Sequence, residues 1–202
     1  MYLFKTPFIF RWIFPRKVWG VSASKQVCLT FDDGPTKELT RWILNELRKE
    51  NIKATFFCVG ENAKNHPELM DEMRSAGHII GNHTMRHENG TKTSKQAYFK
   101  SISEAEPFTS STVFRPPYGR LPISFINPIK HNYKIVMWSW LSYDYDHSVS
   151  VDKILSKAEK IKSGDILVLH DNAKVEERIK IILPKLIQLL KAKGFEFGVI
   201  QS

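Results

Sequence analysis

Short apolar runs alternate with segments of helical periodicity along most of the chain. Residues 27–31 are mostly apolar and end at Asp32-Asp33-Gly34-Pro35, a combination that stops a strand. Residues 39–49 then carry apolar side chains at helical spacing between charged ones. The same alternation predicts further strands at 54–59, 79–80, 112–114, 133–138, 165–169 and 195–199, and further helices at 67–76, 94–104, 151–161 and 176–193.

This order of elements predicts an α/β fold built on one parallel sheet. Strands separated by crossover helices pair in parallel, and the helices cover the outer face of an open sheet or a barrel. The chain of 202 residues shows no repeat and no linker, so we expect one domain over residues 27–202. Two cysteines are too few for a disulfide scaffold, and no apolar stretch is long enough for a membrane-spanning helix.

The net charge of +9 is concentrated at the N-terminus. Residues 1–26 contain five basic side chains and no acidic one. Such an arm can associate peripherally with an anionic cell envelope, but its aromatic residues between Pro7 and Pro15 favour a segment that packs on the domain. Lys5 and Arg11 interrupt the apolar core that a signal peptide requires. Nucleic-acid binding would rest on this arm alone, and we do not expect it.

Polar side chains follow the ends of the predicted strands. They are Asp32 and Asp33 after the first strand, His83 and His87 after the third, Arg115 after the fourth, Trp140 and Asp144 after the fifth, and His170 after the sixth. The carboxyl ends of parallel strands share one face of the sheet, where active sites gather. We therefore expect these residues to form one site.

Asp33, His83 and His87 form a candidate metal site. The two histidines are four residues apart, so on one helical turn both imidazoles would point the same way, although two exposed polar histidines have the same spacing. With a carboxylate they give three ligands and leave room for water, as in catalytic zinc sites. Asp32 would then face the bound water as a base, unless the Asp-Asp pair serves only as a turn and helix cap.

Arg115 and His170 each have a functional and a structural interpretation. Arg115 is followed by two prolines that fix its backbone, and it is either a surface ion-pair partner or a guanidinium that keeps a nearby carboxylate ionised. His170 ends an apolar strand, as a hydrogen-bonded core histidine or as a general acid.

Four segments resemble, in order and spacing, the motifs of the NodB-homology polysaccharide deacetylases (carbohydrate esterase family four). They are Thr30-Phe-Asp-Asp-Gly-Pro35, His83-Thr-Met-Arg-His87, Arg115-Pro-Pro-Tyr-Gly119 and Leu167-Val-Leu-His170. The resemblance extends from about Val27 to the C-terminus. It implies a distorted, incomplete (β/α) barrel that removes acetyl groups from N-acetylated glycans such as peptidoglycan or chitin with the help of a metal ion.

The resemblance also implies a role for each matched residue. The metal, Zn²⁺ or alternatively Co²⁺ or Ni²⁺, would be held by Asp33, His83 and His87. The catalytic residues would be Asp32 as the base, Arg115 as the residue that holds Asp32, Tyr118 as the backbone N–H donor to the oxyanion, and His170 as the acid. The substrate contacts would be Leu167 against the acetyl methyl group, together with Pro117 and Trp140.

One motif departs from the family pattern. The family has Asp-x-x-Asp-Trp after the fifth strand, whereas this chain has Leu141-Ser-Tyr-Asp144-Tyr145. Leu141 stands where the resemblance places the acid that orients the catalytic histidine, so Asp144 or Asp146 would have to take that role, or His170 would act with a lower pKa. Loss of this acid could also mark a sugar-binding protein with reduced activity, and the same site could serve an O-acetyl esterase or a hydrolase of non-sugar amides.

Overall fold

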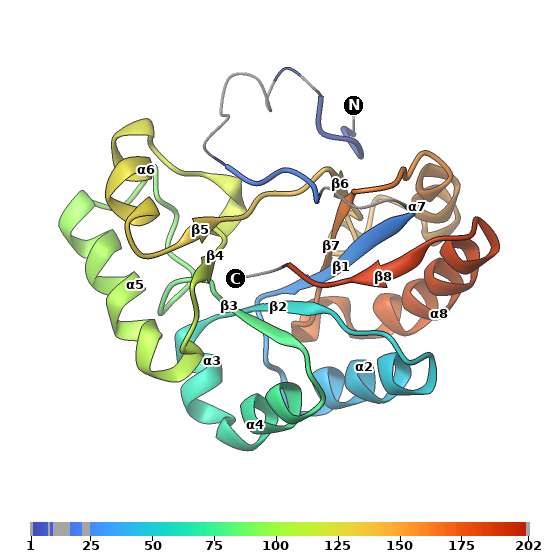
Figure 1. Ribbon diagram of the computed structural model, residues 1–202, viewed down its shortest axis with the longest axis horizontal. Coiled ribbons are helices and arrows are strands. Elements are labelled where there is room, and N and C mark those ends of the chain that lie inside the picture. Colours follow the sequence, from blue (N-terminus) through green and yellow to red (C-terminus); the bar gives the residue numbers. More distant parts are fainter. Residues whose placement is uncertain (1, 8, 10–16, 22–24, 201–202) are drawn as a thin grey trace.

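A curled parallel sheet with helices on its outer side forms the centre of the computed structural model, which describes residues 2–7, 9, 17–21 and 25–200 (Figure 1). The main sheet runs in the order β5-β4-β3-β2-β1-β7-β6, and β8 pairs with β1. Every pairing between these strands is parallel. The strands are β1 (Gln26–Asp32), β2 (Thr55–Cys58), β3 (Ile79–Asn82), β4 (Val113–Phe114), β5 (Lys134–Ile135), β6 (Trp140–Leu141), β7 (Ile166–His170) and β8 (Glu196–Gly198). The α/β fold with an incomplete barrel, predicted from the sequence, is confirmed.

Amphipathic helices pack against this sheet. They are α2 (Lys37–Lys49), α3 (Gly60–Asn65), α4 (Pro67–Ser75), α5 (Lys95–Thr109), α6 (Ile123–Lys130), α7 (Val151–Ala158) and α8 (Glu176–Ala192). In α8 the residues at helical spacing from Ile179 to Leu190 are buried, and full burial of each such side chain contributes about 1.5–3 kcal/mol. Within the described part of the chain, no helix has the length and apolarity needed to cross a bilayer.

The structure differs from the sequence prediction in three elements. Helices α3 and α6 were not predicted, because α3 has only six residues and α6 follows Pro122 and contains Pro128. The single strand predicted at 133–138 is wrong. Only Lys134–Ile135 pairs with β4, and the chain then crosses to the other edge of the sheet, where Trp140–Leu141 pairs with β7.

The described residues of the N-terminal arm cover the gap between these two edges (Figure 1). Near β6, the Thr6 N–H donates to the Ser139 carbonyl and the Leu141 N–H donates to the Phe4 carbonyl, both at 2.9 Å. Near β5, Val18 pairs with Val136. The residues through which the arm was expected to pack lie outside the described residues; they are Phe8, Phe10, Trp12, Ile13 and Phe14.

The pairing of β1 positions the site. Asp32, the last residue of β1, lies opposite His170 of β7 on one side and Phe57 of β2 on the other. The ends of β1, β3, β4 and β7 therefore meet at one edge of the half-barrel.

Candidate active site

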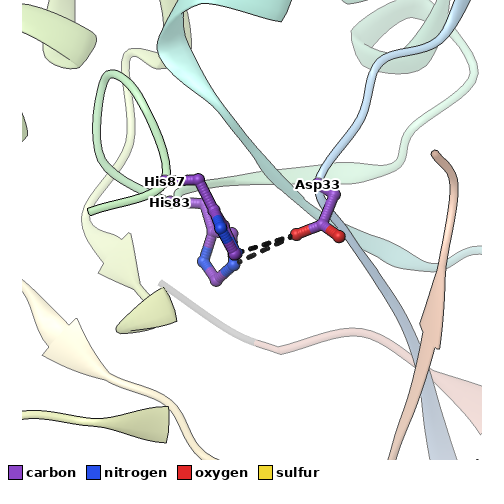
Figure 2. A group of neighbouring side chains, drawn as sticks. All are labelled: Asp33, His83 and His87. Atoms are coloured by element: carbon purple, nitrogen blue, oxygen red, sulfur yellow. Dashed lines mark ion pairs between the residues drawn. The ribbon is translucent and has the colours of Figure 1, made fainter. Parts of the chain in front are cut away.

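Three metal-ligand side chains converge beyond the ends of β1 and β3 (Figure 2). Nε2 of His87 lies 3.1 Å from Oδ1 of Asp33, and Nε2 of His83 lies 3.6 Å from the same oxygen. The ligand atoms of the three residues all lie within 4.8 Å of one another, close enough to share one ion.

A loop, and not a helical turn, brings the two histidines together. In residues 83–88, all of which are described, there is no helix, and Thr84 and His87 have φ angles of 64° and 59°. The backbone of Asp33 also lies in the left-handed region, with a φ of 85°. Each such conformation costs a non-glycine residue about 1–3 kcal/mol and is typical of functional sites. The expected convergence of the imidazoles is therefore present, but the helical reason given for it is wrong.

Hydrogen bonds outside the cluster orient its ligands. Nδ1 of His83 lies 2.7 Å from the Arg115 carbonyl, which can only accept, so Nδ1 carries the proton and Nε2 presents its lone pair to the cluster. Burial lowers the pKa of His83 to about 4, which keeps the ring neutral despite the nearby Asp32 and Asp33. A neutral imidazole with its other nitrogen bonded to a carbonyl fits a divalent metal ion.

Two asparagines hold Asp33. The Asn172 amide donates to Oδ2 of Asp33 at 2.7 Å, and the Asn62 amide donates to its backbone carbonyl at 2.7 Å. Burial alone would raise the pKa of Asp33, but the hydrogen bond with His87 and the charges of the surrounding histidines bring it well below its usual range. Asp33 is thus an anionic side chain that suits a divalent metal ion, and neither asparagine was predicted from the sequence.

Asp32 is held by a fully buried arginine. Nη1 of Arg115 donates to Oδ1 of Asp32 at 2.6 Å and to Oγ1 of Thr30 at 2.7 Å, while Nη2 donates to the Met137 carbonyl at 3.0 Å. The guanidinium carbon lies 4.0 Å from the centre of the Phe57 ring. Burial lowers the pKa of Arg115, and its contact with Asp32 opposes this effect. These bonds fix the direction in which the Asp32 carboxylate points.

His170 has a dedicated carboxylate partner in Asp144. Nδ1 of His170 lies 2.7 Å from Oδ1 of Asp144, and the His170 backbone N–H donates to Oδ2 at 2.8 Å. Burial would lower the pKa of His170, but Asp144 raises it, and the net value is about 9. Asp146 instead bonds Tyr2 and Ser148 at the surface. Of the possibilities that Leu141 left open, the structure supports Asp144 as the acid that partners His170, because Asp144 makes both contacts.

Asp171 connects the end of β7 to the turn after β1. Its N–H donates to the Asp32 carbonyl at 3.1 Å, and its carboxylate accepts from the Gly34 N–H and from Oγ1 of Thr40, each at 2.8 Å. Burial raises the pKa of Asp171 to about 7, with the charges of Asp33 and Asp32 adding to the effect. In the sequence, only the position of Asp171 next to His170 pointed to this role.

A cavity of about 500 Å³ contains Asp32, Asp33, both cluster histidines and His170. Trp138, Leu141, Val168 and Tyr145 contribute aromatic and aliphatic side chains to its wall. The Tyr145 ring meets the His170 ring edge-on, with centres 5.1 Å apart. Tyr118 stands at the rim, 61% exposed, and its ring lies 4.5 Å from that of His87.

The three expected substrate contacts do not line this cavity. Leu167 and Trp140 are fully buried in the core, and Pro117 is buried as well. Trp140 pairs with Leu167 and Leu141 pairs with Val168, so alternate residues of β6 and β7 face opposite sides. Val168, two residues before His170, therefore shares its side of the strand. This period of two was the signal that would have selected Val168 over Leu167.

The site thus combines a candidate metal centre with a carboxylate and a histidine, the components of a metal-dependent hydrolase. Residues 20–133 match the family model of the polysaccharide deacetylases. The chain belongs to the polysaccharide deacetylase family, and it is a metal-dependent hydrolase.

Individual relatives agree with this assignment. A peptidoglycan-N-acetylglucosamine deacetylase from Bacillus cereus is 33% identical over 193 residues, which cover 91% of each chain. The crystal structure of the Bc1960 peptidoglycan N-acetylglucosamine deacetylase in complex with 4-naphthalen-1-yl-N-oxidanyl-benzamide superposes with a TM-score of 0.87 at 32% identity, over 96% of this chain and 95% of the other. A family 4 carbohydrate esterase from Streptomyces lividans, in complex with acetate, gives a TM-score of 0.78 at 28% identity, over 89% and 95% of the two chains.

Proposed function

We propose that this protein removes the acetyl group from N-acetylglucosamine residues of a glycan, and that peptidoglycan is its substrate. The observation that carries the proposal is that Asp32, held by Arg115, and His170, held by Asp144, face the Asp33–His83–His87 cluster in one cavity. Similarity to the peptidoglycan-N-acetylglucosamine deacetylases of B. cereus supports the choice of peptidoglycan as the substrate.

Asp33, His83 and His87 would hold the metal, with Zn²⁺ preferred over Co²⁺ or Ni²⁺ because two imidazoles and a carboxylate suit zinc. When bound, such an ion polarises the acetyl carbonyl and lowers the pKa of water to about 7.

The remaining steps use the protein's own groups. Asp32 accepts a proton from the attacking water, while Arg115 keeps its carboxylate oriented. The backbone N–H of Tyr118 stabilises the negative charge that develops on the acetyl oxygen. His170, kept protonated by Asp144, donates a proton to the sugar nitrogen as the C–N bond breaks. The products are acetate and a free amino sugar.

The register of β1 and β7 places these two groups side by side, each with a different buried partner. Asp32 and His170 are paired across the strands, yet Asp32 has a guanidinium partner and His170 has a carboxylate partner. One residue is thereby suited to accept a proton and the other to donate one.

The test is acetate release by protein stripped of metal and reloaded with Zn²⁺ or Co²⁺. The substrates are peptidoglycan fragments, N-acetylglucosamine oligomers, an O-acetylated sugar and a simple N-acetylated amine. We expect metal-dependent release from the N-acetylated glycans. Release from the O-acetyl ester alone would replace the proposal with an esterase. Absence of release from every substrate, with metal measured in the protein, would overturn it.

A further inference from the structure

A second cavity, of about 440 Å³, adjoins the catalytic one. The two cavities share four wall residues, namely Tyr118, Arg120, Trp138 and Leu141. A chain of sugars whose reacting unit lies in the catalytic cavity therefore has a neighbouring space for the next unit.

The N-terminal arm forms part of this second wall. Leu3, Thr6 and Lys17 line the cavity. Oγ1 of Thr6 donates to the Trp138 carbonyl at 2.9 Å, and the Leu3 N–H donates to the Tyr143 hydroxyl at 3.2 Å. These bonds attach the described residues of the arm to the shared wall, so that they form part of the second cavity.

Two basic side chains, Lys17 and Arg120, line this cavity. Lys17 is only 8% exposed and Arg120 is shared with the catalytic cavity, while none of the described residues that line the second cavity is acidic. A carboxylate placed in the cavity would interact favourably with both cations.

The cavity also has aromatic walls. Trp19, Trp138 and Tyr143 line it together with the rim residue Tyr118. Such rings offer flat apolar faces to one side of a sugar ring and polar edges to its hydroxyl groups. Aromatic walls and two cations in one space fit a sugar that carries an acidic substituent.

We propose that the second cavity binds the sugar next to the one that is deacetylated, and that Lys17 and Arg120 recognise a carboxylate on that neighbouring sugar. This inference rests on the proposed function and narrows its substrate class. Every second sugar of a peptidoglycan strand carries a lactyl ether, whose acid is free where the peptide has been removed, whereas chitin oligomers are uncharged.

The test compares three tetrasaccharides. One alternates N-acetylglucosamine with N-acetylmuramic acid and has free carboxylates, the second is its methyl ester, and the third is the neutral N-acetylglucosamine tetramer. We expect kcat/KM for the acid to exceed that for the ester by roughly tenfold, the size of one charge-assisted hydrogen bond.

Lys17→Met and Arg120→Gln should each reduce this ratio several-fold, and Lys17→Arg should retain most of it. Lys185→Met, at an exposed position on α8, is the matched control.

Binding provides a readout that does not depend on turnover. With the Asp32→Asn variant, calorimetry should give a Kd for the acid roughly tenfold below that for the ester, and the difference should shrink as salt is added. Equal Kd values for acid and ester, or an unchanged acid-to-ester ratio in folded Lys17→Met and Arg120→Gln, would overturn the inference. If no tetrasaccharide releases acetate, the proposed function fails, while the Kd comparison still decides whether the carboxylate is recognised.

Discussion

The two halves of the site are built in different ways. On the side of β1 and β7, Asp32 and His170 are the last residues of paired strands, and each is fixed by a buried partner. On the side of β3 and β4, His87 and Tyr118 lie in loops with left-handed backbone. The sheet therefore sets the proton-transfer groups, whereas strained loops set the metal ligands and the rim. Substitutions of the strand-end groups should affect chemistry, and substitutions of the ligand-bearing loops should affect metal binding.

The largest expected effect separates metal binding from the rest of the site. His83→Ala removes a ligand whose Nε2 lies 3.6 Å from Asp33, so metal and activity should be lost together. Metal content by mass spectrometry and acetate release measure the two losses. His78→Ala removes a buried histidine whose Nδ1 accepts the Ala54 N–H away from the cavity, and it should retain the metal. A fully loaded, active His83→Ala variant would contradict the ligand set.

Asp32→Asn tests the strand side of the comparison. It removes the base while Arg115 and the metal ligands stay in place, so kcat should fall by about 10²–10⁴-fold with metal content unchanged. Acetate release by metal-loaded protein gives kcat. Near-normal turnover would show that another group accepts the proton.

The pH dependence of activity tests the contact between Asp144 and His170. His170 has a pKa raised to about 9 and must be protonated to act as the acid, so activity should fall as pH rises through that region. Asp144→Asn removes the charge that raises this pKa and leaves the burial that lowers it, so the alkaline limb of kcat/KM should move to lower pH. Asp146→Asn, close in sequence but at the surface, should leave the limb in place. An unchanged profile in Asp144→Asn would contradict the assignment of His170 as the acid.

Asn172→Ala should weaken metal binding without abolishing it. The Asn172 amide bonds Oδ2 of Asp33, and loss of such an outer contact typically costs 10–100-fold in metal affinity or activity. Competition with a chelator measures the metal Kd. Asn172→Asp keeps the size of the side chain but places a second negative charge beside Asp33. We therefore expect its metal Kd to differ from that of Asn172→Ala.

The smallest effect on chemistry is expected at Thr40. Thr40→Val leaves one oxygen of the buried Asp171 without its hydroxyl donor, which should lower the free energy of unfolding by about 1–3 kcal/mol. Thr40→Ser keeps the hydroxyl and should recover most of that loss. Denaturant unfolding gives the stability of both variants, and a larger effect on kcat than on stability would show that Asp171 does more than hold the turn.

The sequence predicted the parts of the site that depend on strand ends. Asp32, Asp33 and His170 come directly at or after apolar runs, and parallel strands bring such positions to one edge. Contacts between distant segments were not predictable in the same way. Asn62 and Asn172 reach Asp33 from loops whose positions follow from the order of the sheet, and neither residue type is distinctive by itself.

The register of the strands explains the remaining differences between the predicted and the observed site residues. Leu167 and Val168 are equally apolar, and only the alternation that starts from His170 separates the wall residue from the core residue. The role of Asp144 likewise follows from geometry, because one of its carboxylate oxygens is hydrogen-bonded to the His170 ring and the other to the His170 backbone N–H.

The position of the N-terminal arm has a consequence for synthesis on the ribosome. Thr6 bonds Trp138, which is 132 residues later in the chain, and Leu3 bonds Tyr143, which is later still. At 5–20 residues per second, the arm waits on the order of ten seconds before its partners exist. The arm can therefore take its place only after these later segments have been made, and the second cavity takes shape after most of the half-barrel has been synthesised.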